Sequence, residues 1–122
     1  MYDHIGIKVR NLDASVRFYT AALAPLGIVL CSRDESGAGF GLPGAPSLWL
    51  GISATASGAG MHIAFKSELR AAVDKFFKSG REAGGRDNGQ PGLRVDYSPN
   101  YYAAFLLDPD GYNVEAVCLR DK

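Results

Sequence analysis

The sequence predicts an α+β fold made of two tandem modules, each with the order strand, helix, strand, strand, strand. Two segments in which apolar and polar residues alternate, 2–9 and 60–67, each precede a stretch with apolar residues at helical spacing. Short strand-like segments separated by turn-rich sequence follow each of these stretches. The two halves also match one another in order. We therefore expect a single domain over residues 1–122, with the first module at about 1–53 and the second at about 60–122.

Length and composition exclude several classes of protein. The 122 residues suit one ordinary domain, and 13 Lys and Arg balance 13 Asp and Glu, unlike a strongly basic nucleic-acid-binding protein. The longest apolar run, 21–31, contains Pro25 and Gly27 and is far too short to span a membrane. The first ten residues carry charges and lack the apolar stretch of a secretion signal. We therefore expect a cytoplasmic protein with no nucleic-acid or membrane partner and with reduced cysteines.

The first module begins with the alternating strand at 2–9. The helix that follows has Asn11 as its N-cap, and Pro25 and Gly27 should end it. Its apolar stripe consists of Leu12, Val16, Tyr19 and Leu23. Three short strands are expected near 28–32, 38–42 and 47–52.

The second module repeats this order after a small, polar linker. The helix at 68–83 should end at Gly84 and Gly85, and its stripe consists of Leu69, Val73 and Phe76. The segment 86–100 is rich in Gly, Pro and Asn. We expect a turn at Asp87-Asn88-Gly89 and one strand around 93–97, in a loop long enough to act as a lid. The module closes with a strand at 101–107, a DPDG turn at 108–111 and a strand at 112–118.

Three matches in the same order carry the internal repeat. In the first strands, His4, Ile5 and Lys8 match His62, Ile63 and Lys66 at an offset of 58. In the helices, Leu12, Val16 and Tyr19 match Leu69, Val73 and Phe76 at an offset of 57. Near the end of each module, Ala38, Phe40 and Leu42 match Ala103, Phe105 and Leu107 at an offset of 65. Each module should form a curled mixed sheet with a helix on its outer face, and the two concave faces should surround a shared cavity. At the offset of 65, Glu115 corresponds to Leu50, so the first module supplies no matching carboxylate. Strand alternation predicts that Trp49 faces the helix.

Strand alternation places both histidines and one glutamate on the cavity side. The apolar residues of the strands pack on the helices, which leaves His4, His62 and Glu115 facing inward. Two imidazoles and one carboxylate, with open positions opposite, suit a catalytic divalent ion such as Fe, Mn, Zn, Ni or Co. Because the ligands must be a neutral imidazole and an ionised carboxylate, metal affinity should fall in mild acid. The alternatives are an ordinary core or surface role for each His and a salt bridge from Glu115 to a lysine.

The chain resembles the vicinal oxygen chelate superfamily, which includes glyoxalase I, fosfomycin-resistance enzymes, extradiol dioxygenases and bleomycin-resistance proteins. The resemblance covers essentially the whole chain and rests on DHIGIKVRNLDASVRFYTAAL, MHIAF and FLLDPDGYNVEAV. The segment GGRDNGQPGLRVDYSPNYYAAF looks like a small bacterial subgroup. The resemblance implies paired βαβββ modules and metal ligands at His4, His62 and Glu115. Glyoxalase I usually has a fourth ligand on the fourth strand, where this chain has Leu50, a departure that speaks against lactoylglutathione lyase activity.

The resemblance also implies a substrate that chelates the metal through two neighbouring oxygens, which the ion polarises. The candidates for proton transfer are Glu115, Tyr97 and Tyr101. The candidates for substrate binding are Lys8, Lys66, Arg94, Arg86 and Tyr102. For each tyrosine the alternative is packing, and for each Lys or Arg it is a solvated surface position.

Three functions follow. The first is a metal-dependent lyase, isomerase or dioxygenase acting on a small oxygenated molecule. The second is a metal-free protein that sequesters a ligand, as bleomycin-resistance proteins do, although sequestration does not need both His and the Glu. The third is a thiol transferase like the fosfomycin enzymes, for which no clear potassium-binding loop is present. Each suits a homodimer with a small-molecule partner, and the modules can pair within or between chains.

Overall fold

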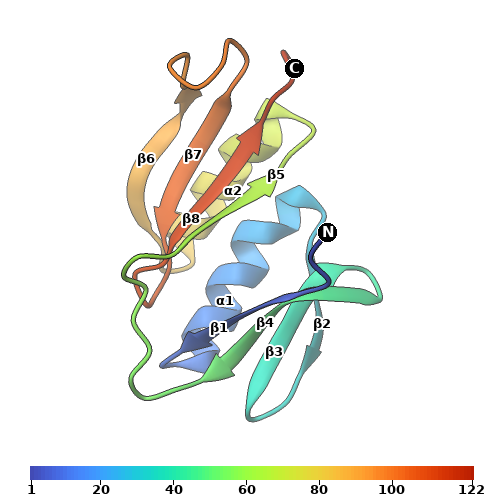
Figure 1. Ribbon diagram of the computed structural model, residues 1–122, viewed down its shortest axis with the longest axis vertical. Helices are drawn as coiled ribbons and strands as arrows, with labels where there is room; N and C mark the ends of the chain where they lie inside the picture. The colour runs from blue at the N-terminus through green and yellow to red at the C-terminus, as the bar shows by residue number, and fades with distance from the viewer.

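The computed structural model describes residues 1–122 and contains two four-stranded mixed sheets and two long helices (Figure 1). The first module comprises β1 (Ile5–Val9), α1 (Leu12–Leu23), the short 3₁₀ helix η1 (Ala24–Leu26), β2 (Val29–Arg33), β3 (Gly37–Leu42) and β4 (Ala45–Ile52). The second comprises β5 (His62–Lys66), α2 (Arg70–Glu82), β6 (Arg86–Leu93), β7 (Tyr102–Leu107) and β8 (Asn113–Cys118). The predicted α+β class is confirmed. No helix of the structure has the length and apolar character that crossing a membrane requires.

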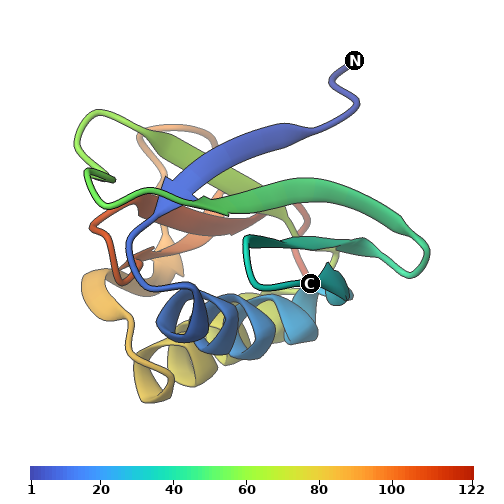
Figure 2. The same ribbon diagram turned by 90° about the horizontal axis from the view of Figure 1, so that it is seen from below.

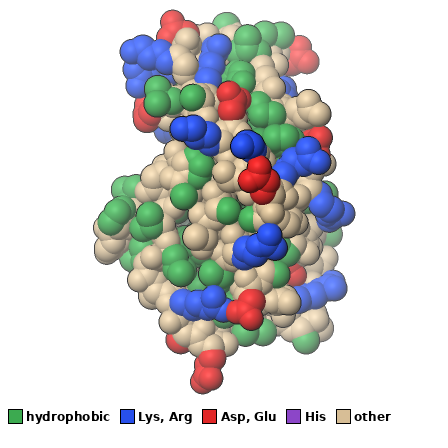
Figure 3. Space-filling view, turned by 180° about the vertical axis from the view of Figure 1, so that it is seen from behind, with side chains coloured by type: hydrophobic (Ala, Val, Ile, Leu, Met, Phe, Trp, Pro, Cys, Tyr) green, Lys and Arg blue, Asp and Glu red, His purple; other side chains and the backbone are tan.

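The two modules have the same topology but their sheets remain separate. The strand orders are β1-β4-β3-β2 and β5-β8-β7-β6, and in each sheet the first strand runs parallel to the last one. The helices pack against one another, and both sheets lie on the same side of this helix layer (Figure 2). The opposite side carries scattered charges of both signs, and neither histidine is visible there (Figure 3). Within one chain, therefore, the sheets do not close around the shared cavity that the sequence predicted.

Helix α1 forms as the sequence predicts. The side chain of Asn11 accepts a hydrogen bond from the backbone N–H of Ala14 at 3.0 Å, which satisfies one of the free N–H groups of the first turn. Gly27 ends the following 3₁₀ helix with a φ of 80°, a conformation that favours glycine. The four residues of the predicted stripe are all buried: Leu12, Val16, Tyr19 and Leu23.

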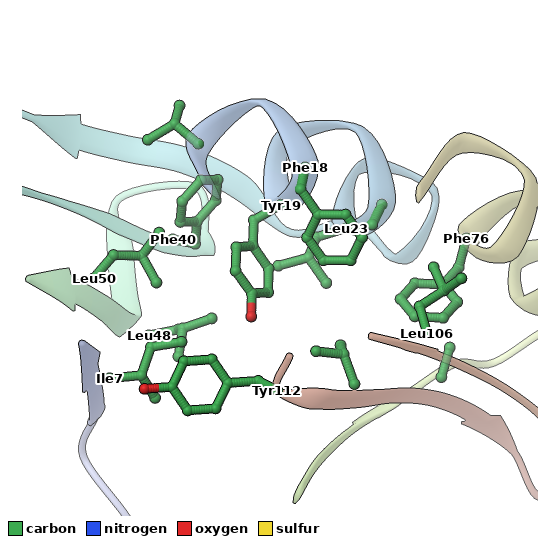
Figure 4. Packing of buried hydrophobic residues seen from close by; sticks show 14 of the residues in the cluster. Ile7, Phe18, Tyr19, Leu23, Phe40, Leu48, Leu50, Phe76, Leu106 and Tyr112 are labelled. Carbon is green, nitrogen blue, oxygen red and sulfur yellow. The ribbon is translucent and has the colours of Figure 1, made fainter. Parts of the chain in front are cut away.

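The DPDG turn joins the two modules through buried hydrogen bonds. Asp108 is 1% exposed and accepts hydrogen bonds from the hydroxyl of Tyr19 at 2.5 Å and from the backbone N–H groups of Tyr112 and Asp110. The hydroxyl of Tyr112 in turn donates to the carbonyl of Lys8 in β1 at 2.7 Å. Figure 4 shows both tyrosines between the modules, with the Tyr112 hydroxyl directed toward β1. These bonds fix the orientation of one module relative to the other.

Three predictions in the second module are wrong. The strand after α2 spans Arg86–Leu93, not 93–97, and it contains Asp87, Asn88 and Gly89 instead of a turn. It is an edge strand with irregular register, which tolerates Pro91 and its glycines. Leu69 does not belong to the buried helix stripe, because it precedes α2 and is 52% exposed.

Strand pairing also corrects the repeat in its last strands. Ala38 pairs with Leu50 in the first sheet and Ala104 pairs with Ala116 in the second, which sets the offset at 66 instead of 65. A shift of one residue moves a side chain to the other face of a sheet. Glu115 therefore corresponds to Trp49, not to Leu50. Trp49 lies on the concave face and is 37% exposed, whereas Leu50 is buried. The conclusion that the first module supplies no matching carboxylate holds.

Candidate metal and substrate site

The concave face of the second module brings His62 and Glu115 into direct contact. Strand β5 lies parallel to β8, with His62 opposite Asn113 and Ala64 opposite Glu115. The Nε2 of His62 lies 2.8 Å from Oε1 of Glu115, and the Glu115 side chain is only 2% exposed. A buried carboxylate requires partners of this kind to offset its lost hydration.

The second nitrogen of His62 determines which atom faces the carboxylate. Nδ1 lies 3.2 Å from the backbone carbonyl of Asn113. A carbonyl oxygen only accepts hydrogen bonds, so Nδ1 carries the proton in this contact. Nε2 is the nitrogen directed at Glu115. This hydrogen bond needs a proton between Nε2 and Oε1, and Nε2 can bind a metal ion only once that proton has left. The ring of Phe105 in β7 is stacked with the imidazole, with 6.1 Å between centroids.

Tyr101 holds the other carboxylate oxygen. Its hydroxyl donates to Oε2 of Glu115 at 2.5 Å, so both oxygens of this carboxylate have partners. Tyr97 lies edge-on to Tyr101, with ring centroids 4.9 Å apart, and it is 66% exposed. Three of the residues predicted for chemistry, Glu115, Tyr101 and Tyr97, therefore lie in one continuous cluster beside His62.

Burial, and then the hydrogen bond to Glu115, raises the pKa of Tyr101 from 10 to about 12. The phenol is thus neutral throughout the physiological pH range. The pKa of Tyr101 is higher in the folded state than in the unfolded state. The protonated phenol therefore contributes its full stabilisation of the fold below pH 10, and this contribution is lost as the pH rises toward 12. We expect the free energy of unfolding of the wild type to fall more steeply than that of Tyr101→Phe over this window. Denaturant titrations at several pH values measure the difference, and parallel curves would contradict the assignment.

His4 lies apart from this cluster. It precedes β1, its side chain is 58% exposed, and its Nδ1 lies 2.6 Å from Oδ1 of Asp3. No group of three or more His, Cys, Asp or Glu side chains in the chain is arranged to hold a metal ion. Within one chain, therefore, His4 does not converge with His62 and Glu115. Of the two pairings left open by the sequence, only pairing between chains could bring the three together. In both histidines an acceptor lies at Nδ1, so Nε2 is the nitrogen left for a further partner. In His62 that partner is Oε1 of Glu115.

The five residues predicted for substrate binding differ in position, and Arg86 begins the edge strand β6. Arg94 lies close to the cluster, with its guanidinium 5.4 Å from the centre of the Phe105 ring and bonded to the carbonyls of Gln90 and Gly92. Lys66 is on the same sheet but is strongly exposed, with its Nζ 4.0 Å from Glu68. Lys8 lies on the concave face of the first module.

Tyr102 does not belong to the site. It shares a face of β7 with the buried Ala104 and Leu106, which point toward α2. Its hydroxyl donates to Asp74 of that helix at 2.6 Å, a bond that raises the pKa of Tyr102.

Three participants were missed at the sequence level: Asp3, Phe105 and Asn113. Asp3 directly precedes His4, and a carboxylate next to a histidine is a readable signal. Phe105 was aligned with Phe40 of the core, and only the corrected offset places it on the concave face. The contribution of Asn113 is a backbone carbonyl, for which the sequence carries no signal.

The sequence matches the family model of the Glyoxalase/Bleomycin resistance protein/Dioxygenase superfamily over residues 2–116. The chain is similar to the solved structure of a glyoxalase/bleomycin resistance protein from Albidiferax ferrireducens, with 29% identity, a TM-score of 0.81 and coverage of 97% of this chain and 98% of that chain. It is also similar to a putative glyoxalase from Bacillus halodurans, at 26% identity and a TM-score of 0.73, covering 97% of this chain and 95% of that chain.

A glyoxalase I variant from Zea mays shares the fold at 24% identity and a TM-score of 0.73. That match covers 99% of this chain and 45% of the maize chain. None of the curated proteins matches the chain.

Proposed function

This chain belongs to the glyoxalase/bleomycin resistance protein/dioxygenase superfamily, and on that premise we propose that it is a divalent-metal-dependent enzyme. Its substrate is a small molecule that binds the metal through two neighbouring oxygens. The observation that carries the proposal is the contact between Nε2 of His62 and Oε1 of the buried Glu115. A divalent cation can take the place of the proton between these two atoms.

One chain brings two of the three metal ligands together, and in this proposal a second copy of the chain supplies the third. Each chain offers His62 and Glu115 from one module and His4 from the other. Both concave faces are open on the side away from the helices (Figure 2), so a twofold partner can place its first module over the second module of this chain. We therefore propose a homodimer in which His4 of the partner completes each site. The acceptor on Nδ1 of each histidine prepares Nε2 for this role.

When bound, the metal acts as a Lewis acid on the two substrate oxygens. The imidazole of His62 and the carboxylate of Glu115 can bind Fe, Mn, Zn, Ni or Co. Because Trp49 stands where the repeat would place a second carboxylate, the protein supplies three ligands and leaves the positions that a chelating substrate needs.

Tyr101 serves two purposes in the proposed site. Its hydroxyl fixes Oε2 of Glu115, which keeps Oε1 directed at His62. Its raised pKa keeps the phenol protonated at rest. When Glu115 accepts a proton from the substrate at Oε2, Tyr101 can give its own proton to a substrate oxygen and regain one from Oε2 along their hydrogen bond. Tyr97 packs edge-on against the Tyr101 ring and limits its movement.

The test is the metal content of the protein purified without added metal and again after loading. We expect about one ion per chain in the wild type, and a loss of about 100-fold or more in affinity for Glu115→Gln and His62→Ala. Lys66→Gln is the matched control, because Lys66 lies on the same strand as His62 but is exposed, and it should keep its metal. Metal should also be released in mild acid. An absence of bound metal under every loading condition would overturn the proposal in favour of ligand sequestration.

A further inference from the structure

A cavity lies on the concave face of the first module, away from His62 and Glu115. Its volume is about 450 Å³, and its lining includes Trp49, Lys8, Gly51 and Asp34. By the corrected repeat, Trp49 holds the position in this sheet that Glu115 holds in the other. The first module thus presents an aromatic ring where the second presents a metal ligand.

The backbone fixes the indole of Trp49. Gly39 of β3 pairs with Trp49, and a Cβ at position 39 would lie 2.6 Å from the ring. Only glycine lets the ring lie against the strand in this way. The side chain remains more than a third exposed, which is unusual for a tryptophan packed on a sheet. A rigid, partly exposed indole offers a stacking surface to a flat ring.

Lys8 supplies the positive charge of this cavity. No carboxylate lies within ion-pair distance of its Nζ, whereas Lys66, its equivalent in the repeat, lies 4.0 Å from Glu68. Asp34 also lines the cavity, but its Oδ1 accepts three hydrogen bonds from Ser36 and Gly37 of the β2–β3 turn. The ammonium of Lys8 is therefore available to an anionic group.

These groups share one face of the first sheet. His4, Gly6 and Lys8 alternate onto the same face, and Trp49 is the neighbour of Gly6. Alternate residues of a strand are about 7 Å apart. His4 and Lys8 thus flank Gly6, one such step away on either side. The indole of Trp49 leans over Gly39 of β3, and the Lys8 side chain reaches over Gly51 of β4.

We propose that the substrate is a planar aromatic molecule with an anionic group. Its ring stacks on Trp49, its anionic group pairs with Lys8, and its neighbouring oxygens lie at the opposite end, toward His4. The placement of those oxygens rests on the proposed function, whereas the binding of the aromatic anion does not require metal.

The single tryptophan makes the proposal directly testable, because the protein has one indole N–H signal in its ¹⁵N–¹H spectrum. Metal-free protein is titrated with 2-naphthoate, with neutral 2-naphthamide and with cyclohexanecarboxylate. We expect 2-naphthoate to shift the Trp49 signal and to bind about fivefold more tightly than the amide, the size expected of an exposed ion pair. Cyclohexanecarboxylate, which has the charge without the flat ring, should leave the signal unchanged.

Variants identify the two contacts. Lys8→Gln should abolish the preference for the acid over the amide, and Lys66→Gln should preserve it. Gly39→Ala should displace the indole and weaken the binding of both naphthalene compounds. An unshifted Trp49 signal, equal affinities for acid and amide, or an unchanged preference in Lys8→Gln would each overturn the inference. Binding of 2-naphthoate to His62→Ala that holds no metal supports the inference even if the wild type proves not to be a metalloprotein.

Discussion

Replacing His4 with alanine is expected to lower metal affinity by about 100-fold or more, as much as replacing His62 does. Of the two histidines, only His62 touches Glu115 within one chain, while His4 belongs to the other module. An equal loss for both variants is the signature of a site that two chains share. Metal content after loading and dialysis measures it.

Asp3→Asn provides a graded control for this prediction. Asp3 accepts a hydrogen bond from Nδ1 of His4 but is not itself a metal ligand in the proposed site. Its replacement should therefore weaken metal binding by about tenfold and no more. If His4→Ala retains its metal while His62→Ala loses it, His4 is not a ligand and the proposed dimeric site is wrong.

Asp108→Ala is expected to lower the free energy of unfolding by about 3 to 5 kcal/mol. Burial is the main cause of the raised pKa of Asp108, and three donors offset the cost of keeping this carboxylate in the interior. Alanine would leave the Tyr19 hydroxyl and two backbone N–H groups without partners inside the protein. Because these bonds join the modules, the loss should affect the whole fold. Chemical denaturation measures it.

Asp110→Ala is the matched control in the same turn. Asp110 is less buried and accepts bonds from the backbone of Arg10 at 3.0 Å and from Ser15 at 3.4 Å, so its removal should cost about 1 kcal/mol. A loss of less than about 1 kcal/mol for Asp108→Ala would show that the buried network does not hold the modules together.

The sequence was sufficient to predict faces where polar and apolar residues alternate. In β5 and β8 the alternation is clear, and it correctly placed His62 and Glu115 on one surface. In β3 the residues that alternate with Ala38 and Phe40 are glycines, and in β7 apolar residues occupy both faces. Neither strand has a period-two signal, so its register could not be read, and the repeat was aligned one residue away from its true offset.

Two other features depend on long-range structure. Pro91 and the two glycines of β6 indicate turns by local preference, but an irregular edge strand accommodates them beside β7. The separation of His4 from His62 follows from the packing of α1 on α2 and from the bonds of Asp108, which set the angle between modules. Periodicity describes each module alone and contains no information about this angle.

Mixing two inactive variants tests the shared site most directly. His4→Ala and His62→Ala proteins are unfolded together, refolded and loaded with metal. If each site takes His4 from one chain and His62 from the other, mixed dimers contain one intact site. The mixture should then regain about a quarter of the wild-type metal content, since about half of its dimers are mixed. A mixture that binds no more metal than either variant alone would contradict a site formed between two chains.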